Sequence, residues 1–268
     1  MPELNIASCD WNAYITLLRQ QDALWARHRD NISLSSYLRC LEDARAVLSL
    51  PSWDELSHRE ATILLGLGTQ YGPHGLLGSL RGAGIVKATF MQDIPEYRHI
   101  RIRIRDAILA AREAETIMDF IRCAQTAVDT IVRLPRFSMA TATRLLTLAR
   151  PDRAVSINGA SKAGLARLTG RTQYWISEPR NYGMLLRWVY AQRWYQSPVP
   201  ADAGAPVPVP GLLAAFDLVK VHAVEQAAGR MQTAQGLGRH HVDDLIIGQR
   251  AFPAHAAQKT DGFHVFSL

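Results

Sequence analysis

Apolar residues recur every three or four positions along most of the chain, a spacing typical of helices with one buried face. This spacing predicts a helix from Trp11 to Arg27 and another from Ser33 to Leu50, which Pro51 ends. Ser52, with Glu55 three positions later, has the spacing of a capping box and predicts the start of a third helix. The first part of the chain is therefore expected to be a series of amphipathic helices.

Two segments depart from this pattern. Gly66 to Gly84 is rich in glycine, which favours a loop whose backbone can approach a ligand closely. Arg98 to Asp106 alternates arginine with isoleucine, which alone is typical of a strand, but it runs directly into a helical pattern. We therefore interpret it as the entrance of a helix, with its arginines on a solvated face. The alternative is that these arginines follow a nucleic-acid backbone.

The helical pattern continues towards the C-terminus. An aromatic helix is predicted from Arg180 to Tyr195, and residues Ser197 to Gly211 are rich in proline and alanine, as expected of a linker. Another helical pattern covers residues 212–229, and a polar tail follows it. The predicted fold class is all-α, with long functional loops.

Composition narrows the classes of protein. The chain has 268 residues, of which 48% are hydrophobic and 20% charged, as in ordinary globular proteins. No apolar run approaches membrane-spanning length, and the N-terminus does not resemble a signal peptide, so we expect a cytoplasmic protein without membrane contact. Cys9, Cys40 and Cys123 are scattered, which argues against a cysteine-rich zinc site or an iron–sulfur cluster. We expect no metal, no cofactor and a monomer.

The net charge of the chain bears on the kind of partner that it binds. The 30 lysines and arginines exceed the 24 acidic residues and give a net charge of +6. An arginine-rich basic surface favours contact with phosphates, although many basic proteins bind no nucleic acid.

The most specific stretch runs from Asp119 to Leu168. Its pattern predicts a helix, a short hairpin with the sequence LPRFS, a second helix, an extended loop and a third helix. A tight hairpin that leads into a helix points free backbone N–H groups at one spot. This geometry suits a phosphate, and the helix dipole reinforces it.

This stretch resembles the helix-hairpin-helix DNA glycosylase superfamily. The family hairpin reads roughly L-P-G-h-G, where h is hydrophobic, and Leu134, Pro135 and Phe137 keep that frame. Arg136 and Ser138 stand where the family prefers glycine. The resemblance covers about fifty residues and implies a helical bundle of two lobes that binds double-stranded DNA and flips a modified base out of the duplex. The residues that the resemblance places against DNA are Arg136, Ser138, Met139, Ala140, Arg144 and Lys162.

The loop RPDRAVSINGAS matches the family loop that delivers a catalytic aspartate, and Asn158 occupies the aspartate position. Cleavage of an N-glycosidic bond builds positive charge on the sugar, which a carboxylate stabilises and an amide does not. Asn158 can hold a water or the substrate, but it is not a general base. An equally weighted interpretation is that Asn158 only caps the following helix. Asp152, Glu178 and Asp217 are the alternative carboxylates, and the sequence does not choose among them.

The resemblance also bears on lyase chemistry. The family's Schiff-base lysine lies early in the second helix, where this chain has Ala140, and no lysine occurs between Lys87 and Lys162. A glycosylase that leaves an abasic site without cutting the strand is therefore expected.

A flipped base needs aromatic or apolar walls. The candidates for this pocket are Gln70, Tyr71 and His74 in the glycine-rich loop, and Trp175 after the motif. The alternatives are a flexible turn for the loop residues and core packing for the tryptophan.

The function expected from this resemblance is that of a monofunctional DNA glycosylase in repair or antiviral defence. The chain is similar to bacterial phage-defence glycosylases that remove glucosylated hydroxymethylcytosine, a substrate that the residues do not establish. One alternative is a non-catalytic helix-hairpin-helix DNA-binding protein that has lost the catalytic acid. Another is a helical interaction domain whose motif is accidental. Salt-sensitive DNA binding distinguishes the two DNA-binding interpretations from this one.

Overall fold

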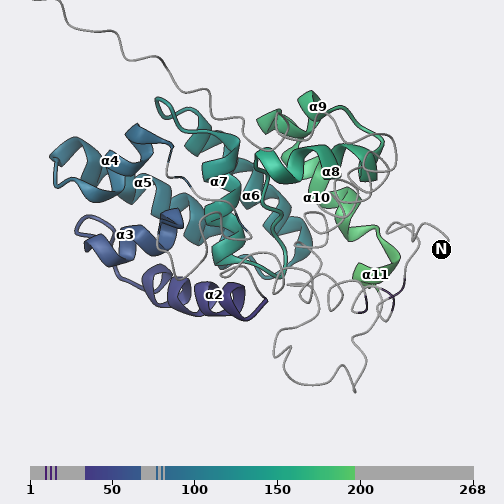
Figure 1. The fold of residues 1–268 in the computed structure, drawn as a ribbon, viewed down its shortest axis with the longest axis horizontal. Coiled ribbons are helices and arrows are strands. Elements are labelled where there is room, and N and C mark those ends of the chain that lie inside the picture. The colour runs from purple at the N-terminus through teal and green to yellow at the C-terminus, as the bar shows by residue number, and fades with distance from the viewer. Residues whose placement is uncertain are drawn as a thin grey trace, which may run out of the picture. The chain divides into compact units, whose positions relative to one another are not determined.

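The computed structural model describes residues 10, 13, 16, 34–67, 77, 80 and 82–196. These residues contain helices and no strand, which confirms the all-α class for this part of the chain (Figure 1). They belong to the first of two compact units, Met1–Gln226, whereas the second, Ala227–Leu268, lies outside the described residues. The elements are α2 (Leu34–Leu48), α3 (His58–Leu65), α4 (Gly84–Met91), α5 (Pro95–Arg112), α6 (Ile117–Val132), α7 (Met139–Ala149), α8 (Gly159–Thr169), α9 (Gln173–Ser177), the 3-10 turn η2 (Pro179–Asn181), α10 (Tyr182–Tyr190) and α11 (Arg193–Gln196).

Helix α7 lies at the centre of this arrangement and packs against α2, α5 and α6. Every residue of α7 except Ala140 is buried. Small side chains allow close packing on all sides. The hydroxyls of Thr143 and Thr147 donate back to the carbonyls of Met139 and Thr143, each at 2.8 Å, so these buried polar groups are satisfied within the helix.

Helix α5 contains the arginine–isoleucine segment, and the prediction that this segment is helical is confirmed. The prediction of a solvated arginine face is wrong for part of it. Arg105 Nη2 donates to Leu50 O at 2.6 Å, and Arg112 Nη1 donates to Leu48 O at 2.7 Å. Arg103 is exposed as expected. The inward arginines bind the carbonyls at the end of α2, which no further turn of helix satisfies.

Arg101 is the most buried arginine of this face, at 2% exposure. Its Nε donates to Trp53 O at 2.7 Å, and its Nη1 donates to Thr89 O at 2.8 Å and to Gln92 O at 3.0 Å. Its Nη2 donates to Asp54 O. One guanidinium therefore joins the segment before α3 to the end of α4. Burial lowers the pKa of this guanidinium from its ordinary value.

The predicted start of α3 at Ser52 is wrong. The helix begins at His58, with Ser57 as its N-cap and a capping box formed by Ser57 and Glu60. Ser52 instead accepts a hydrogen bond from the amide of Asp54 at 3.2 Å, in a turn. Trp53 accounts for the shift, because its side chain is fully buried and its indole N–H donates to the carbonyl of Val47 at 3.2 Å.

The other predicted elements have mixed outcomes. The helix expected from Ser33 to Leu50 is confirmed by α2, whereas the one expected from Arg180 to Tyr195 is divided into η2, α10 and α11. The predicted helices at Trp11–Arg27 and 212–229 and the linker at Ser197–Gly211 lie largely or wholly outside the described residues, as does most of Gly66–Gly84. Among the described helices, none is long and apolar enough to cross a bilayer.

Candidate nucleic-acid interface and catalytic loop

The turn between α6 and α7 has a backbone conformation that ordinarily requires glycine. Leu134 and Phe137 are buried, and the amide of Phe137 donates to the carbonyl of Leu134 at 3.1 Å, which closes the turn. Between them, Arg136 is exposed and has a φ of 63°, in the left-handed region. Residues other than glycine rarely adopt this backbone conformation. This is one of the two positions at which the hairpin motif of the resembled family has glycine.

The first turn of α7 presents backbone donors. Ser138 is its N-cap, exposed and extended, and its side chain makes no capping hydrogen bond. The carbonyl of Ser138 accepts from the amides of Thr141 and Ala142 at 3.0 and 3.1 Å. The amides of Met139 and Ala140 donate to no other residue in the described part of the chain. The positive end of the α7 dipole is thus next to the exposed Arg136.

The segment after α7 turns back and runs along that helix. The amide of Ile157 donates to the Thr143 hydroxyl at 2.9 Å, so the segment comes level with the N-terminal half of α7. Residues Ala154 to Ile157 are buried. This path brings Asn158, the next residue, towards the part of α7 that follows the turn.

Two tyrosines fix this returning segment. The hydroxyl of Tyr182 accepts from the amide of Val155 and donates to its carbonyl, both at 3.1 Å, and Tyr190 Oη donates to Arg153 O at 2.6 Å. Burial raises the pKa of both tyrosines well above its ordinary value. Both therefore remain neutral donors. The sequence indicated neither contact, because the partners of Tyr182 and Tyr190 lie 27 and 37 positions away along the chain.

Asn158 immediately precedes α8 and is half-buried. Its Oδ1 accepts from the amide of Ser161 at 3.1 Å, while the Ser161 hydroxyl accepts from the amide of Asn158 at 2.9 Å. This reciprocal pair is a helix cap, which agrees with the interpretation of Asn158 as a capping residue. Lys162 follows one turn later, is half-buried and forms no ion pair with another described residue.

Asp152 lies at the other end of the returning segment from Asn158. Both its carboxylate oxygens accept from Arg150, with Nε–Oδ1 at 2.9 Å and Nη2–Oδ2 at 2.7 Å, and Arg153 Nε lies 3.6 Å from Oδ2. The hydrogen bond to Asp152 raises the pKa of Arg150. Two arginines therefore hold the Asp152 charge beside the C-terminal end of α7, which does not support a catalytic role next to Asn158.

Arg144 does not lie at the surface, in contrast to the expected DNA contact. It is 1% exposed, and its guanidinium donates to the carbonyls of Leu64 at 2.7 Å and Ile63 at 3.3 Å. These carbonyls belong to the last turn of α3, so Arg144 ties the central helix to α3. Gly66, the left-handed C-cap of α3, leaves the space that this guanidinium fills.

The expected base-pocket residues are only partly described. Trp175 is half-buried on α9, and the Arg171 guanidinium carbon lies 5.4 Å from its ring centroid. The tryptophan is therefore stacked with an arginine at the α8–α9 corner. The other expected residues, Gln70, Tyr71, His74 and Asp217, lie outside the described residues.

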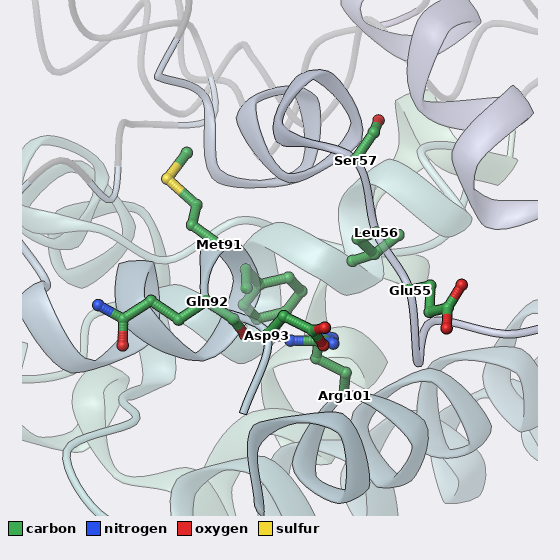
Figure 2. Close-up of a pocket in the computed structure, with 8 residues that line it drawn as sticks. Glu55, Leu56, Ser57, Met91, Gln92, Asp93 and Arg101 are labelled. Carbon is green, nitrogen blue, oxygen red and sulfur yellow. Dashed lines mark hydrogen bonds between the residues drawn. The ribbon is translucent and has the colours of Figure 1, made fainter. Parts of the chain in front are cut away.

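A pocket of about 500 Å³ lies elsewhere, where the segment before α3 meets the ends of α4 and α5 (Figure 2). Glu55, Gln92 and Asp93 line it, with Arg101 at its base. Asp93 forms two hydrogen bonds of 2.6 Å with Arg98, which lowers the pKa of Asp93. None of the expected site residues lines this pocket, and the guanidinium at its base is already bound to backbone carbonyls.

Among the described residues, no group of three or more histidine, cysteine, aspartate or glutamate side chains is placed to hold a metal ion. Comparison of the chain with family models, with curated proteins and with solved structures gave no significant match.

Proposed function

We propose that the chain is a monofunctional DNA glycosylase of helix-hairpin-helix type, acting on a modified base such as glucosylated hydroxymethylcytosine. The observation that carries this proposal is the left-handed turn at Arg136, followed by an α7 whose first amides have no described partner. Such a turn suits a DNA phosphate, which the helix dipole and the Arg136 side chain attract. In this proposal Ser138, Met139 and Ala140 contact the same phosphate through their backbone.

The catalytic part of the proposal rests on the segment that returns along α7. It brings Asn158 level with the N-terminal half of the helix, on the DNA-binding side of the proposed fold. There the Asn158 amide would position the sugar or the attacking water, while Lys162 contacts the backbone. Water adds its oxygen to the sugar carbon as the bond from that carbon to the base nitrogen breaks, the departing base takes up the proton that the water loses, and an abasic site remains.

The test uses end-labelled duplexes with normal, damaged and hypermodified bases, including glucosylated hydroxymethylcytosine, followed by hot alkali. Asn158→Ala removes both the cap and the amide, whereas Asn158→Ser keeps a capping oxygen and removes only the amide. Alkali-dependent breaks at one modified base that are lost in both variants would support the proposal. Equal cleavage by the wild type and Asn158→Ser would instead restrict Asn158 to its cap.

A second candidate is a non-catalytic DNA-binding protein with the same turn. The observation in its favour is that the Asn158 Oδ1 is already engaged as a cap. Duplex binding that weakens steeply with salt, without breaks at any base tested, would support this candidate and contradict the glycosylase. If the chain neither breaks nor binds any of the duplexes, both the glycosylase and the non-catalytic DNA-binding protein are contradicted.

A further inference from the structure

Helices α8 and α9 meet at a corner of the fold (Figure 1). At this corner an exposed tyrosine is next in sequence to a tryptophan that is stacked with an arginine. Tyr174 is 71% exposed, the most exposed large hydrophobic side chain in the described part of the chain. Arg171 is also exposed, and its guanidinium lies over the ring of Trp175. We define Arg171, Tyr174 and Trp175 as the aromatic corner.

The backbone of the aromatic corner is held in place from several sides. The Thr172 hydroxyl caps α9 by accepting from the amide of Trp175 at 3.1 Å. The buried Asn181 donates through Nδ2 to the carbonyl of Trp175 at 3.0 Å, and Gln125 of α6 donates to the carbonyl of Pro179 at 2.9 Å. The backbone that carries the exposed Tyr174 is therefore firmly anchored.

The surroundings of the aromatic corner are basic. Residues 159–180 include Lys162, Arg167, Arg171 and Arg180 against a single acidic residue, Glu178. Glu178 lies 3.5 Å from the Nε of Arg180. Positive charge interleaved with an exposed aromatic ring suits a strand that carries both phosphates and unstacked bases.

We infer that the aromatic corner binds single-stranded DNA, with an unpaired base stacked on Tyr174 and the adjacent phosphate near Arg171. The inference extends the proposed function and relies on it for the presence of a DNA substrate. In intact duplex the bases are stacked on each other, so Tyr174 would meet a free base face only where the strands have separated. The favoured substrate is then a duplex with a single-stranded flank.

The length of α8 determines how many nucleotides should separate the single-stranded flank from the modified base. The helix has 11 residues between Asn158 and the aromatic corner, or about 16 Å at about 1.5 Å per residue. A DNA strand covers this distance in about five nucleotides, at about 3.4 Å each. A tail that begins about five nucleotides from the modified base would therefore reach Tyr174.

The experiment measures the affinity of the full chain for a blunt duplex and for the same duplex with a single-stranded tail at that distance, on either strand. We expect the tail to tighten binding, and Tyr174→Ala to abolish this gain, a loss of about five-fold to a hundred-fold by the usual strength of base stacking. Tyr174→Phe keeps the ring and should keep the gain. Arg171→Gln should lower the salt dependence of tail binding by about 0.7 in slope.

The controls are Met184→Ala and Arg103→Gln. Met184 is 50% exposed on α10, and Arg103 is exposed on α5, so these changes remove an exposed apolar group and an exposed charge outside the aromatic corner. No gain from the tail, or a loss as large in Met184→Ala as in Tyr174→Ala, would overturn the inference.

Cleavage of the blunt duplex separates the two proposals. If the wild type and Tyr174→Ala cleave it equally and the tail adds nothing to binding, the glycosylase stands and the aromatic corner does not. If nothing is cleaved but the tail gain still depends on Tyr174, the aromatic corner stands and the glycosylase does not.

Discussion

The arginines of α5 and those that follow α6 and α8 look alike in the sequence, yet the structure uses them differently. Arg101 and Arg105 point inward and bind backbone carbonyls before α3 and at the end of α2. Arg136 and Arg171 lie exposed at turns. The comparison teaches that an excess of arginine does not locate a nucleic-acid surface, because some of the arginines donate hydrogen bonds to backbone carbonyls at or near helix ends.

The largest effect that tests this comparison is expected from Arg101→Met. The change leaves the buried carbonyls of Trp53 and Thr89, and the carbonyl of Gln92, without their donor. We expect a loss of about 3–5 kcal/mol in the free energy of unfolding, measured by urea denaturation. Arg103→Met, at an exposed position of the same helix, should change it by less than about 0.5 kcal/mol. Equal losses would contradict the distinction between inward and outward arginines.

A smaller effect is expected from Gly66→Ala, which tests the inward Arg144. Both Gly66 and Gly170 have a φ of 66°, so alanine is strained at either position. A Cβ at Gly66 would come within 2.7 Å of Arg144 Nη2, whereas one at Gly170 would have no atom within 4 Å. We expect losses of about 2–4 kcal/mol for Gly66→Ala and about 1–2 kcal/mol for Gly170→Ala.

The difference between the two variants isolates the cost of displacing the buried guanidinium. Thermal unfolding of both, compared at one pH, provides the measurement. If Gly170→Ala is as costly as Gly66→Ala, the packing of Arg144 against α3 contributes no part of the loss.

The smallest expected effect on the free energy of unfolding is a gain in stability, where the previous variants lose it. Arg136→Gly relieves a left-handed residue and should stabilise the protein by about 0.5–1 kcal/mol. It should also lower the slope of DNA affinity against salt by about 0.9, because one phosphate contact is lost. Arg133→Gly is the matched control, since Arg133 has an ordinary φ of −74° and gains nothing from glycine. A stabilised variant with an unchanged salt slope would separate the strain at Arg136 from DNA contact.

Local patterns predicted much of the described fold. Apolar spacing and proline indicated α2, and the α6–turn–α7 segment follows the expected order. The start of α3 was missed because Ser52–Glu55 and Ser57–Glu60 have the same capping spacing. Only the burial of Trp53 in the tertiary structure decides between them.

The site could be predicted less well than the fold, because its contacts join distant residues. Capping was one of two equally weighted interpretations of Asn158, and its hydrogen bond with the Ser161 amide agrees with it. Arg144 was assigned to DNA through the family resemblance, but its partner Leu64 lies 80 positions earlier. Asp152 was considered as a catalytic acid, while its pairing with Arg150 depends on how the chain turns after α7.

The pairing of Tyr182 with Val155 has a consequence for the motion of the segment that carries Asn158. Val155 lies between α7 and α8, and its amide is protected by a side-chain hydroxyl of α10 and not by a backbone carbonyl of its own segment. Its hydrogen can therefore exchange with solvent only when the segment separates from α10, a local opening that need not unfold α7. The free energy of that opening sets how often the candidate catalytic loop leaves its place, independently of the stability of the helices on either side.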